Sequence, residues 1–201
     1  MTKKYFTLLA LPFIWNFSVS VSNADIRTTA NTLTQAEWAL LQNRVQQQNT
    51  SVITIADPEQ QRLLQSQSRQ INTTAAHLDV LVAQMQKAML ANKGTGLTAI
   101  QIGIPVRVVI MERSINDKKS VHVFINPELL RKSSTKTNFW ERCLSLPELR
   151  NHLTLRSVDL TIRYEKADGQ ITTELLTGME ASVFQQELDH LNGILLTDHH
   201  S

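Results

Sequence analysis

One segment near the end of the chain has residue types and spacing that could bind a metal ion and activate water. It reads Gln185-Gln186-Glu187-Leu188-Asp189-His190. Residues four apart lie on one face of a helix, so Gln186 and His190 would converge there beside Glu187. Two histidines at this spacing, the first followed by glutamate, would form the zinc-binding helix of many hydrolases. Gln186 occupies the first of these positions, so this segment alone favours a solvated or hydrogen-bonded histidine.

A second segment, Glu141-Arg142-Cys143-Leu144-Ser145, contains the single cysteine of the chain. Thiolate and imidazole are both favoured ligands of zinc and ferrous iron, so Cys143 would add to His190 from a distant part of the sequence. The alternative is that Cys143 is a small buried hydrophobic residue. The cysteine count does not choose between the two, although one cysteine excludes a disulfide within the chain.

A third segment, Gly94-Thr95-Gly96-Leu97-Thr98-Ala99-Ile100-Gln101-Ile102-Gly103, is rich in glycine. Glycine permits close approaches of the backbone that a side chain would block. Gln101 offers an amide donor near the end of the segment. A phosphate-binding loop would end in lysine followed by serine or threonine, and this segment does not.

Taken together and in this order, the three segments resemble the signature segments of peptide deformylases. Those are a glycine-rich loop ending in glutamine, a Glu-Gly-Cys-Leu-Ser segment and a His-Glu-x-Asp-His helix. The similarity extends from about Val52 to Asp198 and includes Ile-Asn-Pro-Glu at 125–128 and Leu-Asn-Gly-Ile-Leu at 191–195. It implies an α+β, peptide deformylase-like fold, with mixed or antiparallel strands around a C-terminal metal-binding helix.

The resemblance also implies a cofactor and a reaction. Cys143 and His190 correspond to two ligands of one divalent metal ion, which is Fe²⁺ in many members and Zn²⁺ or Ni²⁺ in others. The third ligand position holds Gln186. The implied reaction is hydrolysis of the formyl group from N-formylmethionyl peptides, which are the expected partners.

Further roles follow from the resemblance residue by residue. Glu187 corresponds to the general acid–base residue. Gln101 and the backbone N–H of Leu144 correspond to the groups that stabilise the developing oxyanion. The positions that correspond to substrate-binding residues are Gly96, Leu97 and Arg150.

The sequence departs from the family pattern near the expected metal. The amide oxygen of Gln186 is a harder and weaker donor than imidazole for zinc or ferrous iron. Arg142 replaces the usual glycine beside Cys143, and Thr98 and Ile100 replace other residues of the first loop. Two interpretations stay open: a deformylase of reduced or altered activity, and a catalytically inactive relative that binds formylated or other peptides. A thermolysin-like zinc peptidase is excluded because it needs both helix histidines.

The first 24 residues are typical of a signal peptide. Lys3 and Lys4 precede an apolar run over residues 5–17, and Ser22-Asn23-Ala24 supplies small residues at a cleavage site. The alternative is an uncleaved anchor, but the run is shorter than the roughly 20 residues that a spanning helix needs. We therefore expect an exported (periplasmic or secreted) protein, with a signal peptide at 1–24, a polar extension at 25–51 and the deformylase-like domain at 52–201.

Composition limits the classes of partner. The chain has 20 basic and 18 acidic side chains, and the first 24 residues hold two lysines and no acid. Removal of this segment leaves 18 of each sign, so the high pI is no indication of nucleic-acid binding. We expect no nucleic-acid partner and no stable membrane association after cleavage.

Periodicity predicts the elements that position the three segments. Helices are expected over 74–92 and 179–192, and Thr34 with Glu37 has the form of a capping box that begins a short helix. Trp38, Leu41 and Val45 would line one side of that short helix. Residues 59–70 are read as a loop or a short helix. Strands are expected over 106–111, 121–125, 158–164 and 171–175, with the second ending at Asn126-Pro127.

Overall fold

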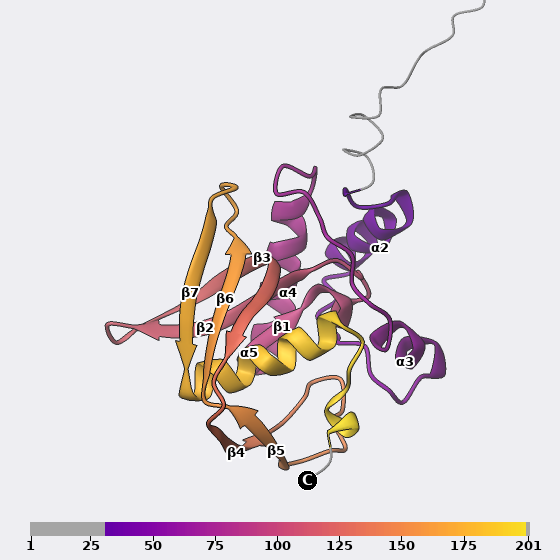
Figure 1. Cartoon of the computed structure of the whole chain (residues 1–201). Helices are drawn as coiled ribbons and strands as arrows, with labels where there is room; N and C mark the ends of the chain where they lie inside the picture. The colour runs from indigo at the N-terminus through magenta and orange to yellow at the C-terminus, as the bar shows by residue number, and fades with distance from the viewer. Residues whose placement is uncertain (1–30, 200–201) are drawn as a thin grey trace, which may run out of the picture. The chain divides into compact units, whose positions relative to one another are not determined.

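The structure is a computed structural model that describes residues 31–199 (Figure 1). The predicted signal peptide at 1–24 lies outside these residues, as does the first part of the predicted extension. Among the helices of residues 31–199, none is long and apolar enough to cross a membrane.

Within residues 31–199, seven strands form two antiparallel sheets. The larger sheet has the order β1-β2-β3-β6-β7, and the smaller one pairs β4 with β5. The strands are β1 (Gly96–Thr98), β2 (Val108–Ile115), β3 (Lys118–Lys132), β4 (Lys136–Glu141), β5 (His152–Ser157), β6 (Asp159–Glu165) and β7 (Ile171–Thr177). With the helices, this arrangement confirms the predicted α+β class with antiparallel strands.

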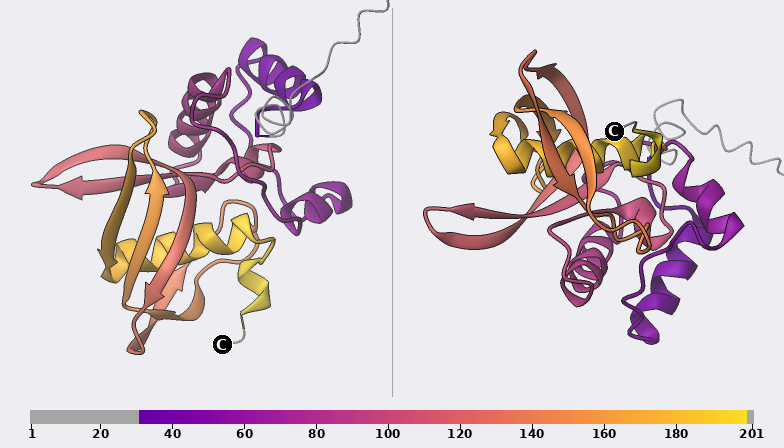
Figure 2. Two further views of the ribbon diagram at one scale, coloured as in Figure 1. Left: turned by 45° about the horizontal axis from the view of Figure 1, so that its top comes forward. Right: turned by 90° about the horizontal axis from the view of Figure 1, so that it is seen from below.

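Four α-helices and two short 3-10 helices complete the described part. They are α2 (Gln35–Gln46), α3 (Pro58–Leu64), α4 (Leu78–Ala91), η1 (Ala99–Ile102), α5 (Gly178–Leu191) and η2 (Leu196–Asp198). Helices α4 and α5 lie on opposite sides of β1 and β2 (Figure 2). The site-bearing helix α5 is therefore held against the sheet, as a C-terminal helix surrounded by strands was expected to be.

Strand β2 is buried on both faces, which allows α4 and α5 to pack on opposite sides of it. Successive side chains of a strand point to opposite faces. Val108 and Ile110 belong to the hydrophobic cluster that contains α4, whereas Val109 and Met111 belong to the one that contains α5. All four are 0–1% exposed. A strand that is buried on both faces reads as a continuous apolar run, which is what the sequence shows here.

Helix α4 is shorter than the predicted 74–92. It begins at Leu78 because His77 takes a left-handed conformation, with φ of +69°, and its ring stacks on Trp38 at 3.6 Å between centroids. The predicted end at residue 92 is close to the observed end at Ala91. Lys93 has φ of +55°, and the Gly94 N–H donates to the Met89 carbonyl.

Strand β3 does not end at Asn126-Pro127, so this part of the prediction was wrong. Asn126 has φ of +49°, and the pairing with β6 shifts register between Ile125 and Glu128. The Asn126 side chain accepts a hydrogen bond from the Ile71 N–H and donates one to the Ile71 carbonyl. The proline is therefore accommodated in a bulge, where it needs no ladder hydrogen bond, and the strand continues to Lys132.

Helix α2 begins with the predicted capping box. The Thr34 hydroxyl accepts from the Glu37 N–H, and the Glu37 carboxylate accepts from the Thr34 N–H. Leu41 is fully buried in the same cluster as α4, and Trp38 packs against that cluster. Val45, at the C-terminal end of the predicted side, is 41% exposed. Residues 58–64, left open as loop or helix, form α3.

Candidate functional site

A cavity of about 610 Å³ opens between three parts of the chain. One wall is the loop that follows α4, a second is the segment between β4 and β5, and the third is α5. Seven of the site residues predicted from the sequence line it: Gly96, Gln101, Cys143, Leu144, Arg150, Gln186 and Glu187. The three signature segments are thus brought to one place.

The centre of the site is a contact between Cys143 and His190. The Cys143 Sγ and the His190 Nε2 are 3.0 Å apart, although 47 residues separate them in sequence. Burial raises the pKa of Cys143 to about 12, with the Glu187 charge adding to the effect. Burial, aided by the charge of Arg156, lowers the pKa of His190 to about 4. Both groups are consequently neutral near pH 7 in the metal-free protein.

The arrangement of these two side chains suits ligands of one ion. A tetrahedral zinc with ligand bonds of roughly 2.3 Å to sulfur and 2.0 Å to nitrogen separates the two atoms by roughly 3.5 Å. The observed 3.0 Å between Cys143 and His190 requires only a small outward movement. The Nδ1 of His190 is buried and has no partner among the described residues, whereas a ligating histidine usually donates this N–H.

Gln186 is the weakest donor among the three potential metal ligands. Its Nε2 donates to the Arg142 carbonyl at 3.3 Å, which leaves its carbonyl oxygen as the group available to a metal ion. Within residues 31–199, no group of three or more His, Cys, Asp or Glu side chains is placed to hold a metal ion. The donors therefore fit a divalent ion with two strong ligands and one amide oxygen in place of the third.

Glu187 lies beside this pair in an apolar setting. The residue is 4% exposed, and its Oε2 has no partner among the described residues. Burial raises the pKa of Glu187 to about 8, and the charges of Glu141 and Asp189 act in the same direction. A β-carbon on Gly96 would lie 2.5 Å from Oε1 of Glu187, so only glycine permits this approach. A carboxyl group with a pKa near neutrality is suited to both accept and donate a proton.

Gln101 presents a donor to the floor of the cavity. Its Oε1 accepts from the N–H and hydroxyl of Thr98 at 2.9 and 3.0 Å, which fixes the orientation of the amide. The Nε2 donates to the Ser145 hydroxyl at 3.2 Å and lies 4.0 Å from the Cys143 sulfur. The side chain is thus oriented with its N–H groups toward the reacting centre, as an oxyanion-stabilising group requires.

The proposed substrate-binding residues separate into two groups. Gly96 and the exposed Arg150 line the cavity. Leu97 is fully buried in the hydrophobic cluster that contains α4 and does not line the cavity. Leu97 follows Gly96 in β1, so its side chain points to the opposite face of the strand. The assignment of Leu97 to substrate binding therefore stays a prediction, and it would involve the backbone of the loop and not the Leu97 side chain.

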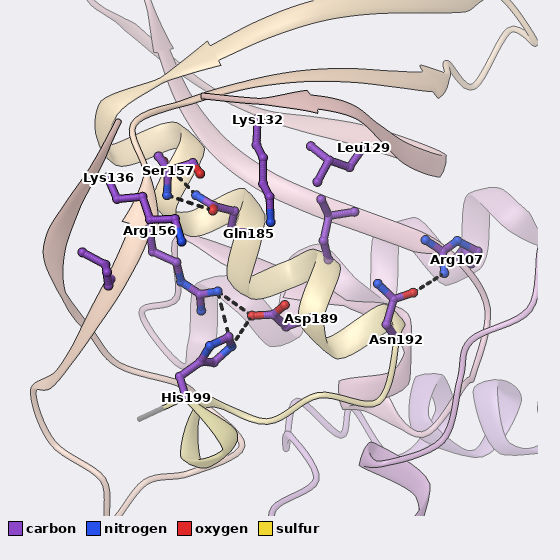
Figure 3. A pocket seen from close by; sticks show the side chains of 12 residues that line it. Arg107, Leu129, Lys132, Lys136, Arg156, Ser157, Gln185, Asp189, Asn192 and His199 are labelled. Carbon is purple, nitrogen blue, oxygen red and sulfur yellow. Dashed lines mark hydrogen bonds and ion pairs between the residues drawn. The ribbon is translucent and has the colours of Figure 1, made fainter. Parts of the chain in front are cut away.

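Sequence reasoning missed the residue that connects the two ligand-bearing segments. Arg156, on β5, donates from Nε and Nη2 to both oxygens of Glu141 at 2.9 and 3.0 Å, and from Nη1 to Asp189 at 2.6 Å. Figure 3 shows Arg156, Asp189 and His199 together in a second pocket beside α5, with His199 Nε2 2.8 Å from Asp189. Glu141 also accepts from the Ser182 hydroxyl of α5.

The ion pairs of Arg156 with Glu141 and Asp189 matter because both carboxylates lie close in sequence to a potential metal ligand. Glu141 lies two residues before Cys143, and Asp189 directly precedes His190. Arg156 and Glu141 are 4% and 6% exposed. Burial acts to lower the pKa of Arg156, but the hydrogen bonds and charges of Glu141 and Asp189 raise it overall. The alternation of polar residues around 152–157 was a possible signal for β5, but nothing in it identifies the partners of Arg156.

Replacing Arg156 by methionine is expected to lower the free energy of unfolding by about 3–5 kcal/mol, because Glu141 and Asp189 would be left as unpaired charges in a poorly solvated position. Metal content is expected to fall with it. The matched control is Arg163→Gln, which breaks an exposed ion pair with Glu128 and should cost less than about 1 kcal/mol. Urea denaturation and elemental analysis measure both effects. Equal stability of the two variants would contradict the assigned role.

The raised pKa of Glu187 predicts a pH-dependent stability in the metal-free protein. Between its ordinary pKa of 4.5 and about 8, the unfolded chain releases a proton that the folded chain keeps. The free energy of unfolding therefore falls as pH rises through this range. His190, with its pKa lowered from 6.5 to about 4, acts in the opposite direction, but only below its ordinary pKa.

Thermal unfolding of the metal-free protein is compared at pH 6.5 and 8 in the parent and in Glu187→Gln, because the remaining contribution of His190 is then common to both proteins. Glu187→Gln is expected to reduce the loss of Tm between the two pH values, and the exposed Glu148→Gln should leave it as in the parent. An unchanged pH dependence in Glu187→Gln would show that another group causes it.

Comparison with known proteins gives the same family as the motifs. Residues 51–201 match the model of the polypeptide deformylase family. The peptide deformylase of Agrobacterium fabrum is 36% identical over 149 residues, which cover 74% of this chain and 85% of that protein. The peptide deformylase of Mesorhizobium japonicum is 34% identical over 149 residues, with 74% and 82% covered.

Solved structures of similar fold also belong to peptide deformylases. A probable peptide deformylase from Synechococcus phage S-SSM7 superposes with a TM-score of 0.68 at 34% identity, covering 75% of this chain and 99% of that one. The peptide deformylase of Thermotoga maritima gives a TM-score of 0.66 at 31% identity, with 75% and 96% covered. Sequence, fold and site geometry lead to one assignment: the chain belongs to the peptide deformylase family.

Proposed function

We propose that this chain is a metal-dependent hydrolase that removes the formyl group from N-formylmethionyl peptides, with activity reduced by Gln186. The observation that carries the proposal is the 3.0 Å contact of His190 with Cys143, which lines the same cavity as Glu187. A related structure, from Acinetobacter baumannii, was solved with Met-Ala-Ser bound, which supports a peptide as the ligand class.

The residues that would hold the ion are Cys143 and His190, with the amide oxygen of Gln186 as a weaker third donor. Members of the family use a single metal ion. Fe²⁺ is the usual ion by resemblance, with Ni²⁺ also possible, but we favour Zn²⁺ because thiolate-bound iron is prone to oxidation in an exported protein. When bound, the ion supplies Lewis-acid activation of water and of the formyl carbonyl.

The protein groups account for the remaining steps. Glu187 takes a proton from the attacking water and later gives it to the departing amine. The Nε2 of Gln101 and the backbone N–H of Leu144 donate to the formyl oxygen as negative charge develops on it. The C–N bond then breaks, giving formate and a peptide with a free amino terminus, so that one water is consumed for each formyl group.

The glutamine at position 186 also favours a second candidate function. With glutamine at the first helix position, the protein would bind formylated or other peptides in the cavity without turnover. Peptide binding that survives chelation, in a protein without hydrolytic activity, would support this candidate. Turnover that a chelator abolishes would exclude it.

The decisive test compares metal content and turnover of the processed parent protein with those of its Gln186→His variant. Restoring an imidazole is expected to raise metal content to about one ion per chain. Turnover of a formyl-methionyl peptide should rise by at least about tenfold, because changes even to groups that orient a ligand typically alter affinity or activity by roughly 10–100-fold. Glu187→Gln in the Gln186→His background should remove turnover while the metal content stays. Failure of Gln186→His to raise either quantity would locate the defect elsewhere, with Arg142 the first candidate.

We also propose that the protein is exported and meets formylated peptides outside the cytosol. The support is the sequence pattern of residues 1–24 alone. Expression of the full chain in a bacterial host, followed by fractionation and intact-mass measurement, should yield a periplasmic or secreted species that begins at Asp25. A full-length species confined to the cytosol would contradict export, and a full-length species in the membrane would indicate an anchor.

A further inference from the structure

The rim of the cavity carries three exposed cationic side chains. Lys93 follows α4 on one side, and Arg142 and Arg150 flank the segment between β4 and β5 on the other. None of the three takes part in any of the ion pairs formed within residues 31–199. Their charges are therefore available to a ligand that enters from either side.

No acidic residue of the cavity opposes these charges at the rim. Among the residues that the structure describes, only two with carboxyl side chains line the cavity, Glu141 and Glu187. Glu141 is buried and already accepts two hydrogen bonds from Arg156 and one from Ser182. Glu187 is 4% exposed and lies at the metal side of the cavity. The nearby Glu148 is exposed but does not line the cavity.

The same cavity also has exposed apolar surface. Trp140 and Met179 both line the cavity and are 67% and 62% exposed. A ligand that suits this rim combines an apolar residue with a negative charge nearby. A short peptide with a free terminal carboxylate, or with an acidic residue close to its N-terminus, has this combination.

We propose that Lys93 and Arg142 select anionic formyl peptides, chiefly short ones whose α-carboxylate lies near the cavity rim. The proposal rests on the proposed deformylase function and names its substrate class. Arg150 already had a substrate role by resemblance, whereas Lys93 and Arg142 had none. Arg142 stands where the family pattern has glycine, so the selection is a property of this chain.

The experiment compares formyl-Met-Ala-Ser as free acid, as C-terminal amide, and with lysine replacing serine in the amide. At low salt, the kcat/KM of the free acid is expected to exceed that of the amide by about tenfold, since each exposed pair contributes a factor of roughly one and a half to five. The lysine peptide should be poorer still. At about 1 M NaCl, the screening length falls to about 3 Å and the preference should disappear.

The variants Lys93→Gln and Arg142→Gln are each expected to reduce the ratio of acid to amide by about threefold at low salt. Lys118→Gln, on the exposed β2–β3 turn, is the matched control and should leave the ratio unchanged. Equal kcat/KM for acid and amide in the parent protein, or an unchanged ratio in both Gln variants, would overturn the proposal.

A binding measurement separates this proposal from the proposed function. The tryptophan fluorescence of the protein, which includes Trp140 at the rim, can be titrated with Met-Ala-Ser as free acid and as amide. Tighter binding of the acid, lost in Arg142→Gln, supports charge selection even where no peptide is hydrolysed. Hydrolysis of all peptides at equal rates, with equal dissociation constants, would retain the deformylase function and reject the selection.

Discussion

The geometry of the site depends on one buried guanidinium. Arg156 joins Glu141, which precedes Cys143 by two residues, to Asp189, which directly precedes His190. Removing charges from water is costly, so a buried ion pair is weak evidence for net stability. Its effect here is positional, because the five donors of a planar guanidinium fix the direction of two carboxylates at once. The two potential ligands consequently meet from separate segments without any covalent connection between them.

Burial, together with this placement, determines the electrostatics of the cavity floor. Low exposure raises the pKa values of Cys143 and Glu187 and lowers that of His190, so all three side chains favour their neutral forms in the metal-free protein. A thiol must lose its proton to bind a metal ion, so binding at this site would be coupled to proton release. Replacing an imidazole by the amide of Gln186 reduces the ligand strength that favours this release.

Local patterns in the sequence predicted much of the fold, and long-range pairing explains the differences. The capping box of α2, the helix α5 and the strands β2, β6 and β7 follow from residues within a few positions of one another. The β4–β5 pair was not predicted, because β4 shows no clear alternation and the alternation of residues 152–157 does not identify a partner strand. Pairing of Lys136 with Ser157 is set by contacts across the sheet. The continuation of β3 past Asn126 likewise depends on the distant backbone of Ile71.

The sequence by itself determined the types of the site residues and the placement of Gln186 and His190 on one helical face, since helical spacing is a local property of the backbone. It also determined that an imidazole is missing. Only the tertiary structure decided that Cys143 reaches His190, that Leu97 belongs to the core and not to the cavity, and that Arg156 holds both segments. These relations join residues far apart in the chain, and packing of β1, β4 and β5 against α5 sets their distances.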